Sequence, residues 1–322
     1  MEHAVHDEVA PNPSTGNVDA GARRARVFGP AAVVALGGGS VLDAAKGVSL
    51  LVGNPDAVAA DADQLWEAAD GLPLIAIPTT SGTGAETNGF GVIEATGACL
   101  KVYLGHPSVK PRIALLAPEL TLGLPAPATA ATGIDALVHG IESLASRGAN
   151  PVSAAYATQA VTMVSGALPM AYRDGSDLDA RAALMLGAHL AGQALTLSGL
   201  GLVHGIGHAL TAPSGTPHGV ALAAVLEEAM VFSAPAARDA YEQAGRAMRL
   251  APPADGDWAR ATVRAVREIS GTLDITRPLR ELGADRGMLP AIAAGAVADA
   301  VTKNAPLLPS EAEVLEILTR VH

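Results

Sequence analysis

Residues 31–53 read AAVVALGGGSVLDAAKGVSLLVG, and this stretch decides the fold class. It opens with a short apolar run, 31–36, which is typical of a strand buried on both faces of a parallel sheet. A glycine turn follows at 37–39, and Ser40 can cap the helix predicted after it. Such a turn lets the backbone and the helix N-terminus approach a phosphate. Because any strand-to-helix turn can carry glycines, this turn alone does not establish a nucleotide site.

Two further apolar runs extend the same pattern along the chain. Residues 72–80, LPLIAIPTT, predict a second buried strand, and residues 112–118, RIALLAP, predict a third. Strands that alternate with helices indicate an α/β domain with a parallel sheet. The loop SGTGAETN at 81–88 follows the second strand, so it lies at the same sheet edge as the glycine turn, where α/β folds bind ligands. The two loops together favour a dinucleotide.

The second part of the chain has a different pattern of apolar residues. From about residue 126 the sequence shows helical patterns broken by Gly, Pro and Asp, with no convincing strand. A chain of 322 residues also exceeds what one hydrophobic core usually serves. We therefore predict a dinucleotide-binding α/β domain over 1–125 and an all-α domain over 126–322.

Composition excludes several classes of partner. The net charge is −11, and the only lysines are Lys46, Lys101, Lys110 and Lys303, which form no basic run. Nucleic acids and anionic membranes bind proteins through clustered Lys and Arg, so neither is expected as a partner. The N-terminus lacks a basic, apolar leader, and no apolar stretch approaches a membrane span. The single cysteine, Cys99, fits a reducing compartment, so we expect a cytoplasmic protein.

Acidic and imidazole side chains recur at helical spacing in the second part. Asp135 and His139 are four residues apart, as are His204 and His208, which places each pair on one helix face; His218 follows a turn-rich link. A carboxylate with imidazoles and no thiol suits Fe²⁺, Zn²⁺ or Mn²⁺. A single histidine on an apolar helix is more often a hydrogen-bonded core residue. Burying four such groups without a cation would leave polar groups unpaired, so the spacing alone leaves both interpretations open.

With these motifs the sequence resembles the iron-containing (group III) alcohol dehydrogenase family. The resemblance covers nearly the whole chain, in the family's order. It is carried by PNPSTGNVDAG (11–21), VVALGGGSVLDAAK (33–46), PLIAIPTTSGTGAET (73–87), ATGIDALVHGIES (131–143), GLGLVHGIGHAL (199–210), TPHGVALA (216–223) and NAPLLPSEAEVLEIL (304–318). The family joins an α/β dinucleotide-binding domain to a helical metal-binding domain, in agreement with the division above.

The resemblance implies roles for individual residues. Asp135, His139, His204 and His218 match the four metal ligands, which implies Fe²⁺, with Zn²⁺ as the alternative. His208 matches a histidine beside the nicotinamide that is linked to proton transfer, so it is the implied catalytic residue. Asp43 matches the family pattern, although its place near a helix start could equally be structural. The implied cofactor positions are Asn12, Gly38, Gly39, Ser40, Asp43, Thr79, Thr80, Thr83, Val92 and Lys101.

The implied activity is reversible oxidation of a small alcohol to an aldehyde or ketone with NAD or NADP. The four intact ligand positions separate the chain from maleylacetate reductases, glycerol dehydrogenases and dehydroquinate synthases. Two alternatives stay open: a truncated, non-catalytic homologue that binds metal or partner subunits, and a metal-dependent lyase of dehydroquinate-synthase-like architecture.

The sequence departs from the family in two places. Ala117 stands where the family has an acid in its DPELT motif, and only ten residues precede Pro11, where the family has a longer strand–helix–strand segment. We expect a short gene model, and hence a Rossmann-like domain truncated at its start, because the downstream site residues all survive. That segment commonly senses the adenosine ribose, so NAD and NADP stay open. In several relatives it also contributes to a dimer, so the resemblance allows a homodimer.

Overall fold

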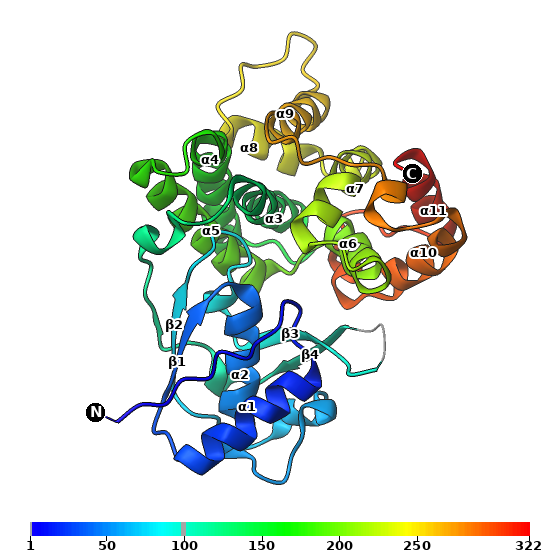
Figure 1. The fold of residues 1–322 in the computed structure, drawn as a ribbon. Coiled ribbons are helices and arrows are strands. Elements are labelled where there is room, and N and C mark those ends of the chain that lie inside the picture. Colours follow the sequence, from blue (N-terminus) through cyan, green and yellow to red (C-terminus); the bar gives the residue numbers. More distant parts are fainter. Residues whose placement is uncertain (1, 98–100) are drawn as a thin grey trace.

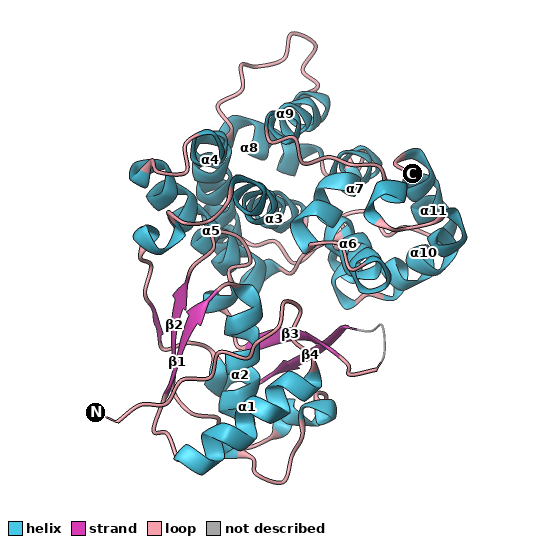
Figure 2. Cartoon of the chain, in the orientation of Figure 1, coloured by secondary structure: helices cyan, strands magenta, loops and turns pink. Residues whose placement is uncertain are grey.

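The computed structural model describes residues 2–97 and 101–322, and it contains two differently built parts (Figure 1). The first part holds every described strand, whereas the described chain from residue 126 onward is made of helices and short 3₁₀ turns (Figure 2). The predicted fold class, α/β followed by all-α, is confirmed. The division between 125 and 126 stays a prediction of where one domain ends. Cys99, on which the expectation of a reducing compartment rests, lies outside the described residues.

A small parallel sheet anchors the first part. Its strands are β1 (Val33–Gly37), β2 (Leu74–Pro78) and β5 (Ile113–Ala114), in the order β1-β2-β5. Helix α2 (Gly39–Gly53) crosses over from β1 to β2, as a parallel connection requires. All three strands lie inside the predicted apolar runs except for the end of β1, which extends to Gly37. The third is shorter than predicted, because only Ile113 and Ala114 pair with β2.

The expectation that the strands are buried on both faces is wrong for the outer strands. Val34, Ile75 and Ile113 form one row across the sheet, and they share a face with Leu36. Val34 is 61% exposed, Leu36 56% and Ile113 54%. Helix α2 covers the opposite face, where Ala35 is buried. An apolar run therefore identified the strands, but it did not show how many faces the rest of the fold would cover.

A helix and a hairpin complete the first part. Ser14 caps α1 (Thr15–Phe28) in a reciprocal capping box with Asn17. Strands β3 (Phe90–Glu94) and β4 (Lys101–Gly105) pair antiparallel in a separate sheet and pack against α2. The hairpin was not predicted, because tertiary contacts with α2, and not a strong apolar run, hold its short strands in place.

The second part is a helical assembly around one large hydrophobic core. Helix α3 runs through its middle and contacts α4, α5, α7 and α8 (Figure 1). Its helices are α3 (Ala126–Ala145), α4 (Pro151–Arg173), α5 (Leu178–Ser198), α6 (Leu202–Ser214), α7 (His218–Ser233), α8 (Arg238–Ala247), α9 (Trp258–Thr272), α10 (Leu289–Ala298) and α11 (Glu311–Arg320).

Glycines bring the two parts into close contact. A Cβ atom on Gly82, in the loop after β2, would lie 2.7 Å from Cβ of Thr132 on α3. One on Gly84, whose φ is +62°, would lie 2.5 Å from Cα of Gly192 on α5. Only a residue without a side chain fits at either place. The loop that follows β2 is therefore fixed directly against the helical part.

Within the described residues, no single helix is long and apolar enough to cross a membrane. Helices α5 and α6 reach the length and apolar composition of a membrane span only when taken together, and the chain bends by 102° between them.

A buried lysine joins α2 to β3. Lys46 is fully buried, and its ammonium group donates to Oδ1 of Asn88 at 2.8 Å and to the carbonyl of Phe90 at 2.5 Å. Oδ1 of Asp43 lies 3.5 Å away. Burial lowers the pKa of Lys46 and raises the pKa of Asp43, and the attraction between the two charges opposes both shifts. Three acceptors thus match the three donors of the ammonium group.

Replacing this lysine should destabilise the fold. In Lys46→Met the carboxylate of Asp43 stays buried without its cation, a change that costs about 3–5 kcal/mol. We expect a clear fall in the thermal unfolding temperature, measured by circular dichroism. Lys110→Met removes an exposed lysine and serves as the control. Equal unfolding temperatures for the two variants would contradict the structural role of Lys46.

Candidate metal centre and cofactor edge

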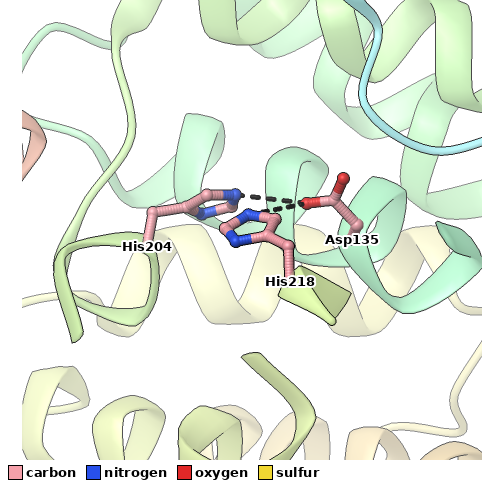
Figure 3. Close-up of side chains that lie close together, drawn as sticks. All are labelled: Asp135, His204 and His218. Carbon is pink, nitrogen blue, oxygen red and sulfur yellow. Dashed lines mark hydrogen bonds and ion pairs between the residues drawn. The ribbon is translucent and has the colours of Figure 1, made fainter. Parts of the chain in front are cut away.

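Four candidate ligands converge from three helices. Asp135 and His139 lie one turn apart on α3, His204 lies near the start of α6, and His218 is the first residue of α7. Figure 3 shows His204 and His218 directed at the carboxylate of Asp135. Oδ1 of that carboxylate lies 3.3 Å from Nε2 of His139, 3.3 Å from Nε2 of His204 and 3.6 Å from Nε2 of His218. Helical spacing thus predicted the α3 pair, the resemblance implied all four residues, and the fold brings His204 and His218 to Asp135.

These donor atoms fit a divalent cation. Ligands bound tetrahedrally to Zn²⁺ at about 2.1 Å are about 3.4 Å apart, close to the separations from Asp135. The ligand atoms of Asp135, His204 and His218 all lie within 4.8 Å of one another. The rings of His139 and His204 stack with centroids 4.6 Å apart. Three imidazoles around one buried carboxylate oxygen are hard to satisfy by hydrogen bonds alone, whereas a cation between them would accept one lone pair from each of the four residues.

The electrostatics also favour a cation at this place. Burial alone would raise the pKa of Asp135, but the three imidazoles hold it below its ordinary value. Burial lowers the pKa of His139 to about 4, and it also lowers the pKa of His218. The rings of His139 and His218 are therefore neutral near pH 7, which is the form that binds metals. Burial would lower the pKa of His204 too, but hydrogen bonds to Asp135 and Glu142 raise it to about 9.

His208 lies one turn beyond His204, at the edge of the cluster. Its ring stacks on that of His218 with centroids 5.4 Å apart. Its Nδ1 atom lies 3.0 Å from Oδ2 of Asp299 and 3.3 Å from the hydroxyl of Tyr103, on β4. A carboxylate only accepts hydrogen bonds, so Nδ1 of His208 must carry the proton that faces Asp299. In the neutral ring the lone pair is then on Nε2.

The implied cofactor residues gather at the carboxyl ends of β1 and β2. Gly38 is the N-cap of α2, and Thr79 donates its backbone N–H to Gly37. A Cβ on Gly38 would lie 3.2 Å from the side chain of Thr80, and one on Gly39 would lie 2.6 Å from that of Thr83. The glycine turn and the threonine loop are therefore in direct contact, as two loops at one sheet edge predict.

The remaining cofactor candidates differ in how close they lie to this edge. Asn12, whose φ is +51°, donates its backbone N–H to the hydroxyl of Ser40 at 3.3 Å. Oδ2 of Asp43 accepts the backbone N–H of Val92 at 3.1 Å, a contact that gives Asp43 a structural role. Lys101, on β4, forms an ion pair with Glu94 at 2.9 Å. The structure thus brings Asn12 and Val92 to the start of α2, whereas Lys101 lies on the separate sheet and lines a cavity with His208. The contacts of all these candidates with a cofactor stay predictions.

Three site residues were missed by sequence reasoning. Glu142 lies on the same face of α3 as Asp135 and His139, three residues beyond the histidine, so helical spacing could have identified it. Asp299 and Tyr103 gave no local signal. Each is about a hundred residues from His208 in the sequence, and only the tertiary fold brings them to it.

The comparisons with known proteins identify the family. Residues 1–118 match the family model described as iron-containing alcohol dehydrogenase. Residues 129–322 match the model described as Fe-containing alcohol dehydrogenase family, C-terminal. The chain belongs to the iron-containing alcohol dehydrogenase family, as its motifs predicted.

Individual relatives agree with this assignment. The chain is 38% identical over 303 residues to a probable alcohol dehydrogenase, EutG, of Escherichia coli K12, covering 94% of this chain and 76% of the relative. It is 32% identical over 320 residues to the lactaldehyde reductase of the same strain, covering 98% and 83%. It resembles the crystal structure of a 1,3-propanediol oxidoreductase with a TM-score of 0.93 and 29% identity, covering 99% and 84%.

A further solved structure carries a nucleotide. The sulfoacetaldehyde reductase from Bifidobacterium kashiwanohense, in complex with NAD⁺, matches with a TM-score of 0.87 and 26% identity, covering 98% of this chain and 82% of that one. Taken together, family and relatives show that this chain is an oxidoreductase that acts on alcohols.

Loss of one imidazole should abolish metal retention. In His218→Ala the cluster keeps three donors, and we expect the affinity for Zn²⁺ to fall more than about 100-fold, since the removed group is a direct ligand. The metal content after dialysis, measured by elemental analysis, checks this. His106→Ala removes an imidazole outside the cluster and should leave the metal content unchanged. Full metal retention by His218→Ala would contradict the ligand assignment.

Proposed function

We propose that this chain catalyses reversible hydride transfer between NAD and a small alcohol or aldehyde, with a divalent metal held by Asp135, His139, His204 and His218. One observation supports this most: three imidazole Nε2 atoms lie 3.3–3.6 Å from one buried carboxylate oxygen. The helix that carries that carboxylate is also in direct contact with the loop after β2. Fe²⁺ is the proposed metal and Zn²⁺ the alternative; NAD is the proposed nucleotide and NADP the alternative.

The chain's own residues divide the work between two sites. When bound, the metal supplies a Lewis acid for the substrate oxygen, and the nicotinamide supplies the hydride acceptor or donor. Gly38, Gly39 and Ser40 open α2, whose first N–H groups and dipole suit a pyrophosphate. Thr80 and Thr83 border the same turn. Contact between the threonine loop and α3 keeps the two sites at a fixed separation, as hydride transfer demands.

His208 is the proposed proton carrier. With Nδ1 occupied by Asp299 and Tyr103, its Nε2 atom is the position that can accept the hydroxyl proton of an alcohol, or return it to the product of aldehyde reduction. Asp299 is also the N-cap residue of a 3₁₀ helix (Ala300–Asn304), where its other oxygen accepts the N–H of Val301 at 2.9 Å. The carboxylate, and with it the ring of His208, is therefore held in one orientation.

A cavity beside His208 sets the size of the ligand. Its volume is about 670 Å³, within the range of about 300–1,000 Å³ that is common for small-molecule sites. Tyr103, His208 and Asp299 supply polar groups at its lining, and Met288 and Ile292 supply apolar ones. The combination suits a short aliphatic substrate with one polar end.

The remaining proposals concern compartment and assembly. The net charge of −11 and the lack of basic runs support an enzyme of small molecules that binds neither nucleic acid nor membrane, and the single cysteine supports a cytoplasmic location. A homodimer is the proposed assembly if the chain oligomerises. Gel filtration with light scattering measures this directly.

Removing the imidazole of His208 should separate turnover from metal binding. In His208→Ala we expect kcat to fall about 10²-fold or more, since general acid–base groups contribute about 10²–10⁴-fold. Zn²⁺ content should stay at the wild-type level, because the four ligands are untouched. A His208→Ala protein that loses its metal would make His208 a ligand instead.

The activity itself is testable with a panel of short aldehydes and alcohols. Protein reconstituted with Fe²⁺, and separately with Zn²⁺, should consume reduced nicotinamide in proportion to aldehyde, as followed by its absorbance. Metal-stripped protein is the control. Nucleotide binding without any net change in absorbance would favour a lyase, and unchanged NADH fluorescence on titration would favour a non-catalytic homologue.

A further inference from the structure

Glu142 is a buried carboxylate that the proposed ligand set does not use. It lies on α3, one turn beyond His139 and two turns beyond Asp135, and only 7% of it is exposed. Both of its oxygens are occupied by groups of α6. Oε2 lies 2.6 Å from Nδ1 of His204 and accepts the backbone N–H of Gly201 at 3.1 Å. Oε1 accepts the backbone N–H of Val203 at 2.7 Å.

The contact with His204 decides which ring nitrogen carries a proton. A carboxylate only accepts hydrogen bonds, so Nδ1 of His204 must be the donor. In the neutral ring the lone pair is then on Nε2, the atom that lies 3.3 Å from Oδ1 of Asp135. Partners of this kind behind metal-ligating histidines fix the tautomer and the ring orientation. Glu142 therefore turns the binding atom of His204 toward the cluster.

The same carboxylate fixes the start of α6. The N-cap of this helix is Gly201, which has no side chain to accept the first N–H groups. The side chain of Glu142, on α3, accepts these N–H groups in place of a capping side chain. A negative charge is also favoured at the positive end of the α6 dipole. A Cβ on Gly201 would lie 3.0 Å from Oε1 of Glu142, so the glycine leaves the room that the carboxylate needs. His204 is the third residue of this helix.

The charges of the cluster also balance only with Glu142 included. When a divalent cation displaces the proton that the raised pKa of His204 keeps on this ring near pH 7, the three imidazoles carry no charge, and the carboxylates of Asp135 and Glu142 carry two negative charges. A divalent cation bound by this set leaves the buried cluster neutral, and a buried net charge is costly.

We propose that Glu142 is a positioning residue, which orients His204 through Nδ1, anchors the N-terminus of α6 to α3 and completes the charge balance for a divalent cation. The inference rests on the proposed metal site, and it assigns Glu142 no direct contact with metal or substrate.

Glu142→Gln tests the inference with little change of shape. The amide nitrogen must face a donor N–H, either that of Val203 or those of Gly201 and His204, so one hydrogen bond becomes a repulsive contact. Facing His204, it would also move the ring proton to Nε2 and block the binding lone pair. We expect Zn²⁺ to bind about 10–100-fold more weakly, as for other partners of ligating histidines. The measurement is competition with a chromophoric chelator, below the unfolding temperature of the metal-free protein.

A matched control separates this role from the general loss of a buried carboxylate. Glu86 is also buried, and its Oε1 lies 3.0 Å from Nδ1 of His189, away from the cluster. Glu86→Gln should bind Zn²⁺ as tightly as the wild type. Gly201→Ala should weaken Zn²⁺ binding by a smaller factor, because its Cβ presses on Oε1 of Glu142; it serves as the second variant if Glu142→Gln does not fold.

The outcomes are distinct. Folded Glu142→Gln protein that binds Zn²⁺ with wild-type affinity would overturn the inference, whatever its unfolding temperature. If Glu142→Gln does not fold, wild-type affinity in Gly201→Ala would do so. Wild-type protein that fails to bind Zn²⁺, Fe²⁺ or Co²⁺ would instead remove the proposed function on which the inference rests.

Discussion

The convergence of three imidazoles on the carboxylate of Asp135 is the interaction on which the functional half of this structure depends. Asp135 is 3% exposed, so its charge cannot be solvated by water. The helices α3, α6 and α7 must therefore keep their relative positions closely enough to hold His139, His204 and His218 against it. In the proposed function, a divalent cation would compensate the buried charge of Asp135.

Support for this cluster comes from groups outside it. Glu142 holds His204 from behind, and Asp299 holds His208 at the rim. Both carboxylates also accept backbone N–H groups at the start of a helical segment, so each is fixed by its surroundings before it orients a ring. Rigid support of this type is what keeps ligand and proton-transfer groups within the narrow geometry that chemistry requires.

The contact between the two parts of the chain has a simple physical basis. Where the loop after β2 meets α3 and α5, Gly82 and Gly84 leave no room for a side chain. The backbone of this loop therefore lies directly against α3, the helix that carries Asp135 and His139. A side chain at Gly82 or Gly84 would push the sheet edge away from α3 and α5.

Local periodicity and short-range turn chemistry were enough to predict the fold class, the three parallel strands and the helical spacing of Asp135 and His139. The motifs of the sequence also determined the family. The exposure of Val34 and Leu36 could not be predicted in this way, since burial depends on which elements cover a strand. The tertiary structure alone brought Asp299 to His208, because no local pattern links residues 91 positions apart. Long-range packing sets such contacts, and a sequence read one segment at a time does not contain them.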